Sequence, residues 1–344
     1  MPLNYFVILF FHFIVIFLLN GVLFPSIYFP DQFNYLHTVT KIRDSMDFFH
    51  YWEYHSSHSI GSVANGSLLF SLFPILFIDS VYSLALVNTM LYSLIFVFLY
   101  KRGYLSGYGV LFYLFFPSLM LYSGIGVRDT WILLFMLFSI YFFINNKFFF
   151  SVLWALPLLL IKFQNFVIFL VAIPVYLILT SGRQTLFSLL VKVGLMVVLL
   201  QVLIAIIGIE YLDFYRMAFY VEDGGKIEEY EPLSGAIDVL FKSTIGAFGF
   251  LLRPFPWEAS GVLQLVQSME NLAIGYIVYL LIKKQLIVKD KKVWFLLIYL
   301  FVAMSIYGLI IYNFGTAVRY RYTFVTIFII FSYYILYLKK DAKS

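Results

Sequence analysis

Long apolar runs recur from one end of this 344-residue chain to the other, and most are about as long as a membrane-spanning helix. The sequence is 63% hydrophobic and only 12% charged, whereas a soluble domain is about 45–50% apolar and about 25% charged. Such an apolar surface is stable where lipid is the solvent. We therefore expect an all-α polytopic transmembrane helical bundle that forms a single integral membrane domain over residues 1–344.

The positions of the runs predict about ten spans. We place them at approximately 4–24, 81–100, 109–123, 131–146, 148–161, 164–180, 186–209, 261–282, 293–312 and 323–338. Two further stretches, 67–78 and 237–252, are shorter or interrupted by charge, and they predict re-entrant or interfacial pieces. The first run has neither a basic start nor a small-residue cleavage site. We therefore expect a retained span rather than a signal peptide.

The charges are divided unevenly between the two predicted faces. With the N-terminus inside, one face collects twelve Lys and Arg residues against two acids, and the other face holds the remaining sixteen acids. Since basic residues mark the cytoplasmic side, we expect both termini in the cytoplasm and a multi-pass protein of the bacterial inner (plasma) membrane. The chemically varied loops, 25–66 and 210–260, would then be periplasmic. A reaction there would take place where ATP and nucleotide-sugars are absent.

The first outer loop carries a carboxylate at the exit of a span. Asp31 follows Pro30, and Tyr35 lies one helical turn further on. A partly desolvated carboxylate is suited to act as a general base towards an acceptor hydroxyl. The alternative is that Asp31 caps a short helix.

The same loop contains a histidine-rich segment, residues 50–58, which suggests a metal site. The segment has no HExxH arrangement, and its spacing does not place three histidines on one helical face. The chain has no cysteine, so thiolate sites are excluded. We favour an aromatic-rich interfacial helix and predict no metal and no cofactor.

A turn at 124–130 joins two predicted spans on the outer side. Arg128 and Asp129 precede the helix that we expect to begin near Thr130. A helix N-terminus favours an anion, and an adjacent guanidinium strengthens that preference. Arg128 therefore binds a phosphate or, alternatively, extends to lipid headgroups; Asp129 contacts substrate or caps the helix.

Two further outer segments differ in character. In the segment 253–258, Arg253 and Glu258 flank two prolines and Trp257, whose flat ring suits either a sugar or the membrane interface. We expect Arg253 to be a further phosphate ligand and Glu258 to contact the sugar. The acidic loop 210–236 is typical of a solvated face, with a flexible lid as the alternative.

Arg319 and Arg321 lie near the start of the last predicted span, with Tyr320 between them. An arginine within a membrane is unfavourable by about 2.5–3.5 kcal/mol at the centre and less at the edge, which makes it a functional candidate. Alternate residues of an extended segment point the same way. The pair could then hold one anion together.

These segments together resemble membrane glycosyltransferases of the GT-C superfamily and the O-antigen or capsule polysaccharide polymerases (Wzy-type) of bacteria. The resemblance covers Asp31, residues 117–135, residues 253–260 and residues 315–324. It implies a periplasm-facing cavity, a polyprenyl-linked sugar donor, an acidic base at Asp31 and phosphate-binding arginines at Arg128, Arg319 and Arg321. Many members carry a proline soon after the C-terminal Arg-Tyr pair, whereas this chain continues with Thr323 and Phe324.

The resulting expectation is a glycosyltransferase of surface polysaccharide assembly, acting at the periplasmic face on undecaprenyl-(pyro)phosphate-linked sugars. Its partners would be the lipid-linked donor and acceptor, membrane lipids and the polysaccharide export machinery, with no nucleic acid. A polymerase of repeat units is favoured over a transferase of single sugars from a polyprenyl monophosphate. A transporter or flippase remains the rival, although the chain shows no convincing internal repeat.

Overall fold

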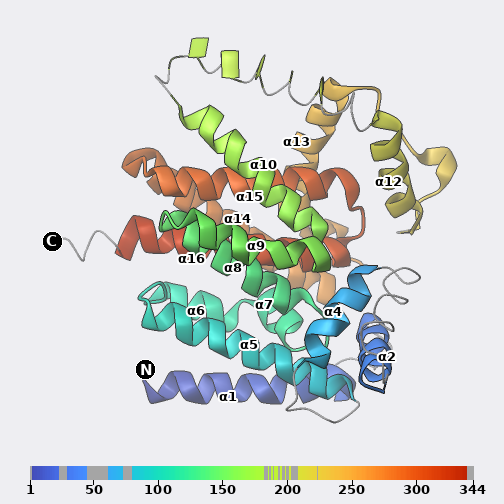
Figure 1. The fold of residues 1–344 in the computed structure, drawn as a ribbon, viewed down its shortest axis with the longest axis vertical. Helices are drawn as coiled ribbons and strands as arrows, with labels where there is room; N and C mark the ends of the chain where they lie inside the picture. Colours follow the sequence, from blue (N-terminus) through green and yellow to red (C-terminus); the bar gives the residue numbers. More distant parts are fainter. Residues whose placement is uncertain are drawn as a thin grey trace. The chain divides into compact units, whose positions relative to one another are not determined.

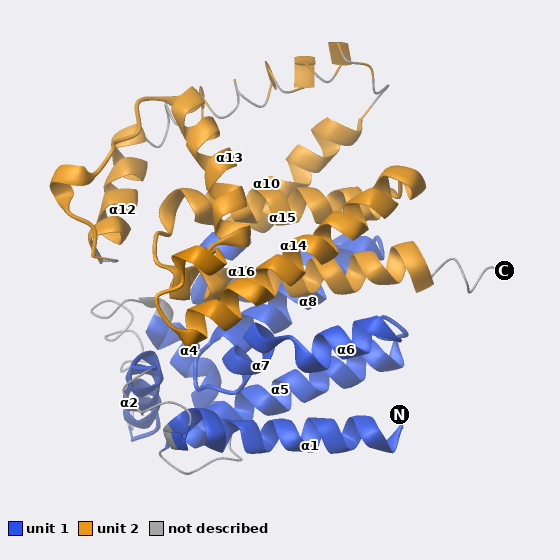
Figure 2. Ribbon diagram, turned by 180° about the vertical axis from the view of Figure 1, so that it is seen from behind, with its two compact units in different colours: residues 1–166 blue, residues 167–344 orange. Residues whose placement is uncertain are grey.

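The computed structural model describes residues 2–22, 29–44, 61–72, 80–181, 208–222 and 224–338, with isolated residues between 185 and 202. These residues fold into helices and turns, and none of them lies in a strand (Figure 1). The expected all-α class is therefore confirmed. The chain groups into two compact units, residues 1–166 (unit 1) and 167–344 (unit 2), where the sequence predicted a single domain (Figure 2).

Unit 1 contains the N-terminal helices. They are α1 (Leu3–Phe17, continued by a π turn at Leu18–Val22), α2 (Asp31–Asp44), α4 (Gly61–Ser71), α5 (Val81–Lys101), α6 (Tyr108–Phe115), α7 (Pro117–Ser123), α8 (Asp129–Ile144) and α9 (Phe148–Ile161). Stacked aromatic rings hold α1, α5 and α6 together, as Tyr92 lies between His12 and Tyr113 at ring-centroid distances of 5.0 and 4.7 Å. Helix α10 (Phe163–Thr180) crosses from unit 1 into unit 2.

Unit 2 contains the C-terminal helices. They are α12 (Ile209–Glu222), α13 (Ala236–Leu252), α14 (Val262–Val288), α15 (Lys291–Ile310) and α16 (Phe314–Tyr333, continued by a π turn at Tyr334–Leu338), with short 3-10 turns at Ile227–Glu229 and Pro256–Glu258. Side chains cap the two long C-terminal helices. Asp290 accepts a hydrogen bond from Lys292 N at 2.7 Å, and Asn313 accepts one from Gly315 N at 2.7 Å. These caps explain where α15 and α16 begin.

Six helices of the described residues are long and apolar enough to cross a membrane, which supports a membrane protein. They are Leu3–Asn20, Val81–Lys101, Phe163–Thr180, Val262–Val288, Lys291–Ile310 and Phe314–Leu338. The remaining predicted spans are not long continuous helices in the described part of the structure. Two are shorter apolar helices, Asp129–Ile144 and Phe148–Ile161. Most of 186–209 lies outside the described residues.

One sequence-based boundary was wrong. The run 109–123 is not one helix, because Pro117 begins a new helix and leaves α6 and α7 with eight and seven residues. The piece predicted at 237–252 is present as a 17-residue helix, α13, and its re-entrant or interfacial placement stays a prediction. The backbones of α13 and α15 approach so closely at Gly246 and Gly308 that a Cβ on either glycine would collide with the other's carbonyl group. Small residues allow such close packing of helices. The predicted piece at 67–78 is described only as far as Leu72, where α4 has just ended.

Candidate functional site

Arg128 is a buried cation at the start of a helix. It occupies the N-cap position of α8 and is 8% exposed. Its Nη1 atom has no hydrogen-bond partner among the residues that the structure describes. A buried charge in a protein is normally paired, because leaving water without a partner is strongly unfavourable. The first-turn N–H groups of α8 add a partial positive charge at the same place.

The loop that carries Arg128 is fixed from two sides. Gln32 of α2 accepts a hydrogen bond from Gly126 N at 2.8 Å and donates one to Asn20 at 2.9 Å. Asn88 of α5 donates from Nδ2 to the carbonyl oxygens of Ile125 and Val127, both at 2.6 Å. Both amide side chains are fully buried. The position of Arg128 is therefore set by the fold before any ligand binds.

Tyr35 and Arg128 meet at Gly66 of α4. A Cβ on Gly66 would lie 2.9 Å from Cε1 of Tyr35 and 3.1 Å from Cβ of Arg128, so only glycine fits there without a shift. Tyr35 is 2% exposed and packs edge-to-face against Phe70 at 6.2 Å. The structure thus brings together two of the sequence-predicted site residues.

Asp31 lies on the same helix as Tyr35. It is the first residue of α2 and is exposed. Tyr35 lies four positions further along the helix, which corresponds to a rise of about 6 Å. Asp129, in contrast, is 2% exposed at the start of α8. Its burial supports a role within the fold.

A second buried cation follows the end of α9. Lys162 is 6% exposed and lies between α9 and α10. Asn65, the neighbour of Gly66, donates a hydrogen bond to Leu160 O at 2.6 Å. Helix α4 therefore contacts both the Arg128 side chain and the end of α9 that leads to Lys162.

In unit 2, Arg321 is fully buried and contacts the end of α13. Its Nη1 donates to the carbonyl oxygens of Phe250, Leu251 and Arg253 at 2.8, 3.2 and 2.8 Å, and its Nη2 donates to Asn271 Oδ1. The last carbonyl groups of a helix lack partners within the helix. Arg321 supplies those partners, so its guanidinium acts within the protein.

The expected shared grip of Arg319 and Arg321 rested on an extended backbone, and that expectation was wrong. Both residues lie inside helix α16, where residues two apart do not share a face. Arg319 and Tyr320 are half-buried. The ring of Tyr320 contacts that of Tyr307 at 5.2 Å.

The segment after α13 is organised by an ion pair. Arg253 Nε lies 2.9 and 3.1 Å from the two carboxylate oxygens of Glu258, which also accepts a hydrogen bond from Phe255 N at 2.9 Å. The hydrogen bonds from Arg253 lower the pKa of Glu258 below its usual value. Trp257 is 79% exposed and stacks on Phe255 at 4.9 Å. Arg253 and Arg321 are thus neighbours in unit 2, joined through the Arg253 carbonyl group.

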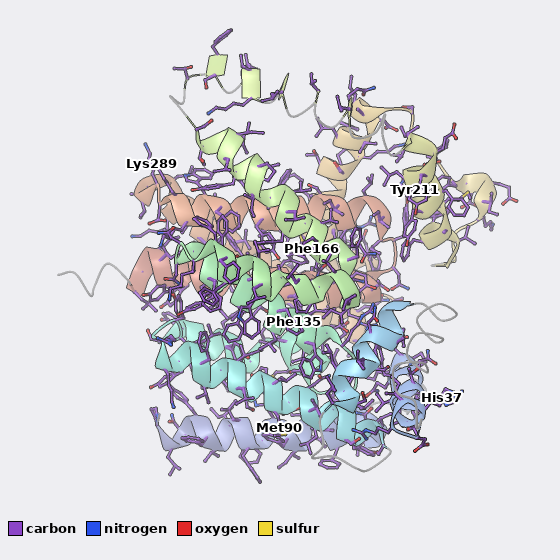
Figure 3. The ribbon with its side chains drawn as sticks, viewed as in Figure 1. His37, Met90, Phe135, Phe166, Tyr211 and Lys289 are labelled. Carbon is purple, nitrogen blue, oxygen red and sulfur yellow. The ribbon has the colours of Figure 1, made fainter. Side chains whose placement is uncertain are left out.

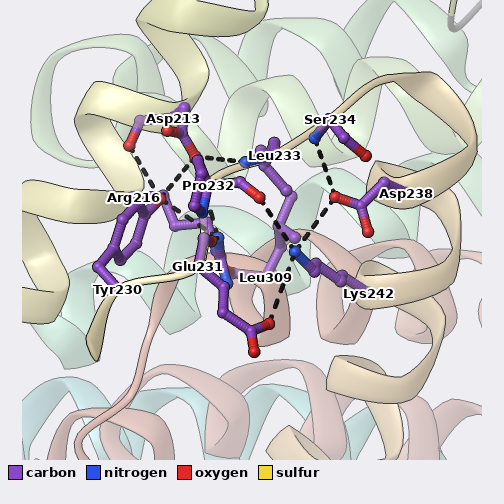
Figure 4. Close-up of polar contacts among 10 residues, drawn as sticks. All are labelled: Asp213, Arg216, Tyr230, Glu231, Pro232, Leu233, Ser234, Asp238, Lys242 and Leu309. Atoms are coloured by element: carbon purple, nitrogen blue, oxygen red, sulfur yellow. Dashed lines mark hydrogen bonds and ion pairs between the residues drawn. The ribbon is translucent and has the colours of Figure 1, made fainter. Parts of the chain in front are cut away.

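The sequence analysis did not identify a third polar cluster, which is centred on Arg216 of α12 (Figure 4). Arg216 is 8% exposed and donates to Leu309 O, Tyr230 Oη and Glu231 O at 3.1, 3.2 and 2.6 Å. Asp213 accepts hydrogen bonds from Tyr230 Oη at 2.6 Å and Leu233 N at 2.9 Å. The helical spacing of Asp213 and Arg216 was the available signal.

The acidic loop is therefore partly structured, although Glu229 is well exposed. Burial and the hydrogen bond to Asp213 raise the pKa of Tyr230, so its hydroxyl group stays protonated.

The histidine-rich segment at 50–58 lies outside the described residues. Within the described part of the chain, no group of three His, Asp or Glu side chains is placed to hold a metal ion.

No protein-family model, curated protein or solved structure matches this chain.

Proposed function

We propose that the chain is a membrane glycosyltransferase that joins sugar units carried on polyprenyl (pyro)phosphate at the periplasmic face, as a repeat-unit polymerase of a bacterial surface polysaccharide. The observation that carries the proposal is the burial of Arg128 with an Nη1 atom that has no partner among the described residues. An anion would complete this environment. A lipid-linked phosphate suits the site because it reaches the protein from within the membrane.

Unit 1 also holds the carboxylate proposed as the general base, Asp31. Asp31 would take the proton of the acceptor hydroxyl, whose oxygen attacks the anomeric carbon of the donor sugar. The bond between that carbon and the phosphate oxygen breaks, and the oxygen keeps the electron pair. Arg128 and the N-terminus of α8 would stabilise the negative charge that develops there. Tyr35 and Arg128 both lie against Gly66, so Tyr35 would help to position Arg128.

The arginines of unit 2 have different roles in this proposal. Arg319, half-buried on α16, stays a proposed phosphate-binding residue within unit 2. Arg321 and Arg253 support the segment that carries Trp257, since their side chains are bound to protein acceptors. Trp257 would offer its exposed ring to a sugar. The choice of a polymerase within the class rests on the resemblance of residues 117–135, 253–260 and 315–324 to such enzymes.

The test is to replace Arg128 in a strain whose only copy of the gene carries the change. Arg128→Gln should leave the protein in the membrane at its normal amount, because Nη1 has no hydrogen-bond partner among the described residues to lose. Surface glycan chains should shorten to single repeats, and lipid-linked repeat units should accumulate. Arg102→Gln is the matched control, because Arg102 is exposed at the end of α5 and should support normal chain lengths.

Two outcomes would contradict the proposal. The first is a normal chain-length distribution from Arg128→Gln. The second is the complete loss of surface glycan in the deletion strain, with lipid-linked units retained on the cytoplasmic leaflet, because this is the phenotype of a flippase.

A further inference from the structure

Helix α12 has its polarity reversed relative to a surface helix of a soluble protein. Its two interior charged residues, Asp213 and Arg216, face the rest of unit 2, where Arg216 binds the Leu309 carbonyl group of α15. The opposite face is exposed and mostly apolar. It carries Tyr211, Phe214 and Tyr215, which are 62%, 62% and 43% exposed. Figure 3 labels Tyr211 on this helix.

The exposed residues form one continuous stripe, which we call the aromatic face. They recur at three- and four-residue intervals, the spacing that places side chains on one side of a helix. The apolar members are Tyr211, Phe214, Tyr215, Ala218 and Val221, and the exposed Glu210 lies at the N-terminal end of the same side. Two of the rings, Tyr211 and Tyr215, contact each other at 6.1 Å.

We propose that the aromatic face of α12 lies in the headgroup–acyl boundary of the bilayer. A row of exposed tyrosine and phenylalanine rings is unfavourable in water, whereas tyrosine is enriched at membrane interfaces, where it has an apolar body and a polar tip. An amphipathic helix lies in the plane of the interface with its apolar face towards the acyl chains. The charged side needs no water, because its groups are bonded to protein.

The rotation of the helix about its axis is set by the Arg216 cluster. The Arg216 guanidinium lies over the rings of Tyr230 and Tyr312 at 5.1 and 5.7 Å. On the same side, Ile209 and Leu212 pack against an apolar cluster of Leu233, Val239 and Leu309. With this side fixed to α15 and the following loop, the aromatic face can only point outwards. Lipid is the occupant that fits, since six described helices are long and apolar enough to cross a membrane and the middle of the face is apolar. The exposed Glu210 lies in the first turn of α12, at one end of the face, where its carboxylate can reach the headgroup region.

The chain has no cysteine, so a spin label can be placed at a single introduced one. Ala218→Cys retains every ring of the aromatic face, and Phe214→Cys and Tyr215→Cys extend the scan. Lys226→Cys provides the matched exposed loop position, and Tyr276→Cys provides an exposed position on the spanning helix α14. The protein is reconstituted in phosphatidylethanolamine–phosphatidylglycerol vesicles. Collisions of the label with oxygen, which concentrates in lipid, and with a water-soluble nickel chelate are measured by electron paramagnetic resonance.

At positions 214, 215 and 218 we expect the ratio of oxygen to nickel collisions to resemble that at 276 and to exceed that at 226 severalfold. Nickel accessibility equal to that at 226 would place the face in water and overturn the proposal. Low accessibility to both reagents would show that protein covers it, and would also overturn the proposal.

The role of Arg216 is tested by Arg216→Gln combined with Ala218→Cys. Loss of the guanidinium should free the helix to rotate, which would lower the oxygen-to-nickel ratio at 218 and sharpen the spectrum. An unchanged ratio and spectrum would overturn the assignment of Arg216 as the residue that sets the orientation of α12.

Discussion

Two buried arginines with different surroundings dominate the chemistry of this chain. The two Nη atoms of Arg321 donate to three main-chain carbonyl groups and to the side chain of Asn271. Arg128 is almost as buried, but its Nη1 atom has no partner among the described residues. A cation of the first kind stabilises the fold. A cation of the second kind is held at an energetic disadvantage, which is common at sites that bind a charged ligand.

This contrast predicts opposite effects of the same substitution. Arg321→Met should destabilise the protein by about 2–5 kcal/mol, because it leaves buried acceptors without donors. Arg128→Met should leave the stability unchanged or raise it, because a similar apolar volume replaces an unpaired charge. Thermal unfolding of both variants in the same detergent measures the difference. Equal losses of stability would show that Arg128 is bonded within the protein and would also weaken the phosphate-site proposal.

The sequence pointed to both arginines but could not assign their roles. Arg128 and Arg321 attracted attention for the same reason, namely that a charge next to an apolar run is unfavourable. The acceptors of Arg321 are main-chain carbonyl groups located 68 to 71 residues earlier. Such acceptors leave no mark in the sequence, because every residue has a carbonyl group.

The helices themselves were largely predictable, because long apolar runs of spanning length determine them. The helix boundary was wrong where a single residue interrupts an apolar run. Pro117 divides one run into α6 and α7. The range predicted at 237–252 matches α13, in which Lys242 does not interrupt the helix and pairs with Asp238 at 3.1 Å. The close packing of α13 on α15 depends on Gly246 and Gly308, which lie 62 residues apart in the sequence and gave no local signal.

The crossing of α13 and α15 can be tested at one glycine. Gly308→Ala would place a methyl group against the Gly246 carbonyl group and force the backbones apart. Alanine gains about 1 kcal/mol over glycine in helix propensity, but overpacking of this kind costs about 1–3 kcal/mol or more. We therefore expect a net loss in thermal stability. Gly249→Ala, inside α13, is the control, since its Cβ would meet only the Arg253 side chain at 3.6 Å, and it should be neutral or slightly stabilising. A stabilised Gly308→Ala variant would contradict the close contact.

The segment after α13 should respond to acid. Arg253 lowers the pKa of Glu258 in the folded protein, so the carboxylate stabilises this segment above the usual glutamate pKa of about 4.3. The contribution is lost as the pH falls below that value through the folded pKa. A fluorophore on Ser260→Cys should become more mobile over this range. With Glu258→Gln added, its mobility should be high at neutral pH and independent of acid; a retained transition would assign the effect to another group.

The molecule as a whole was predicted less completely than its parts. The all-α class and its membrane character followed from composition, and six of the described helices have the required length. The division into units 1 and 2 did not follow, because it depends on which helices pack together rather than on any one run. For the same reason, the only ground that the sequence offered for grouping Asp31 and Arg128 with Arg319 and Arg321 was their predicted position on the same side of the membrane. Within unit 1, α4 lies against Tyr35 and Arg128 at Gly66 and bonds to the end of α9, just before Lys162, through Asn65.

The orientation in the membrane remains a prediction, and a matched pair of lysines tests it. Lys147 and Lys226 are both exposed, the first after α8 and the second in the loop after α12. The excess of basic residues on one face predicts that Lys147 is cytoplasmic and Lys226 periplasmic. Because the chain has no cysteine, Lys147→Cys and Lys226→Cys each give one reactive thiol, and each removes one lysine. A membrane-impermeant maleimide added to intact spheroplasts should label position 226 at once and position 147 only after lysis. Labelling of 147 from outside, alone or together with 226, would place Lys147 in the periplasm and would move the proposed Arg128 site, at the other end of α8, away from it. Labelling of both would also require an even number of spans between the two positions.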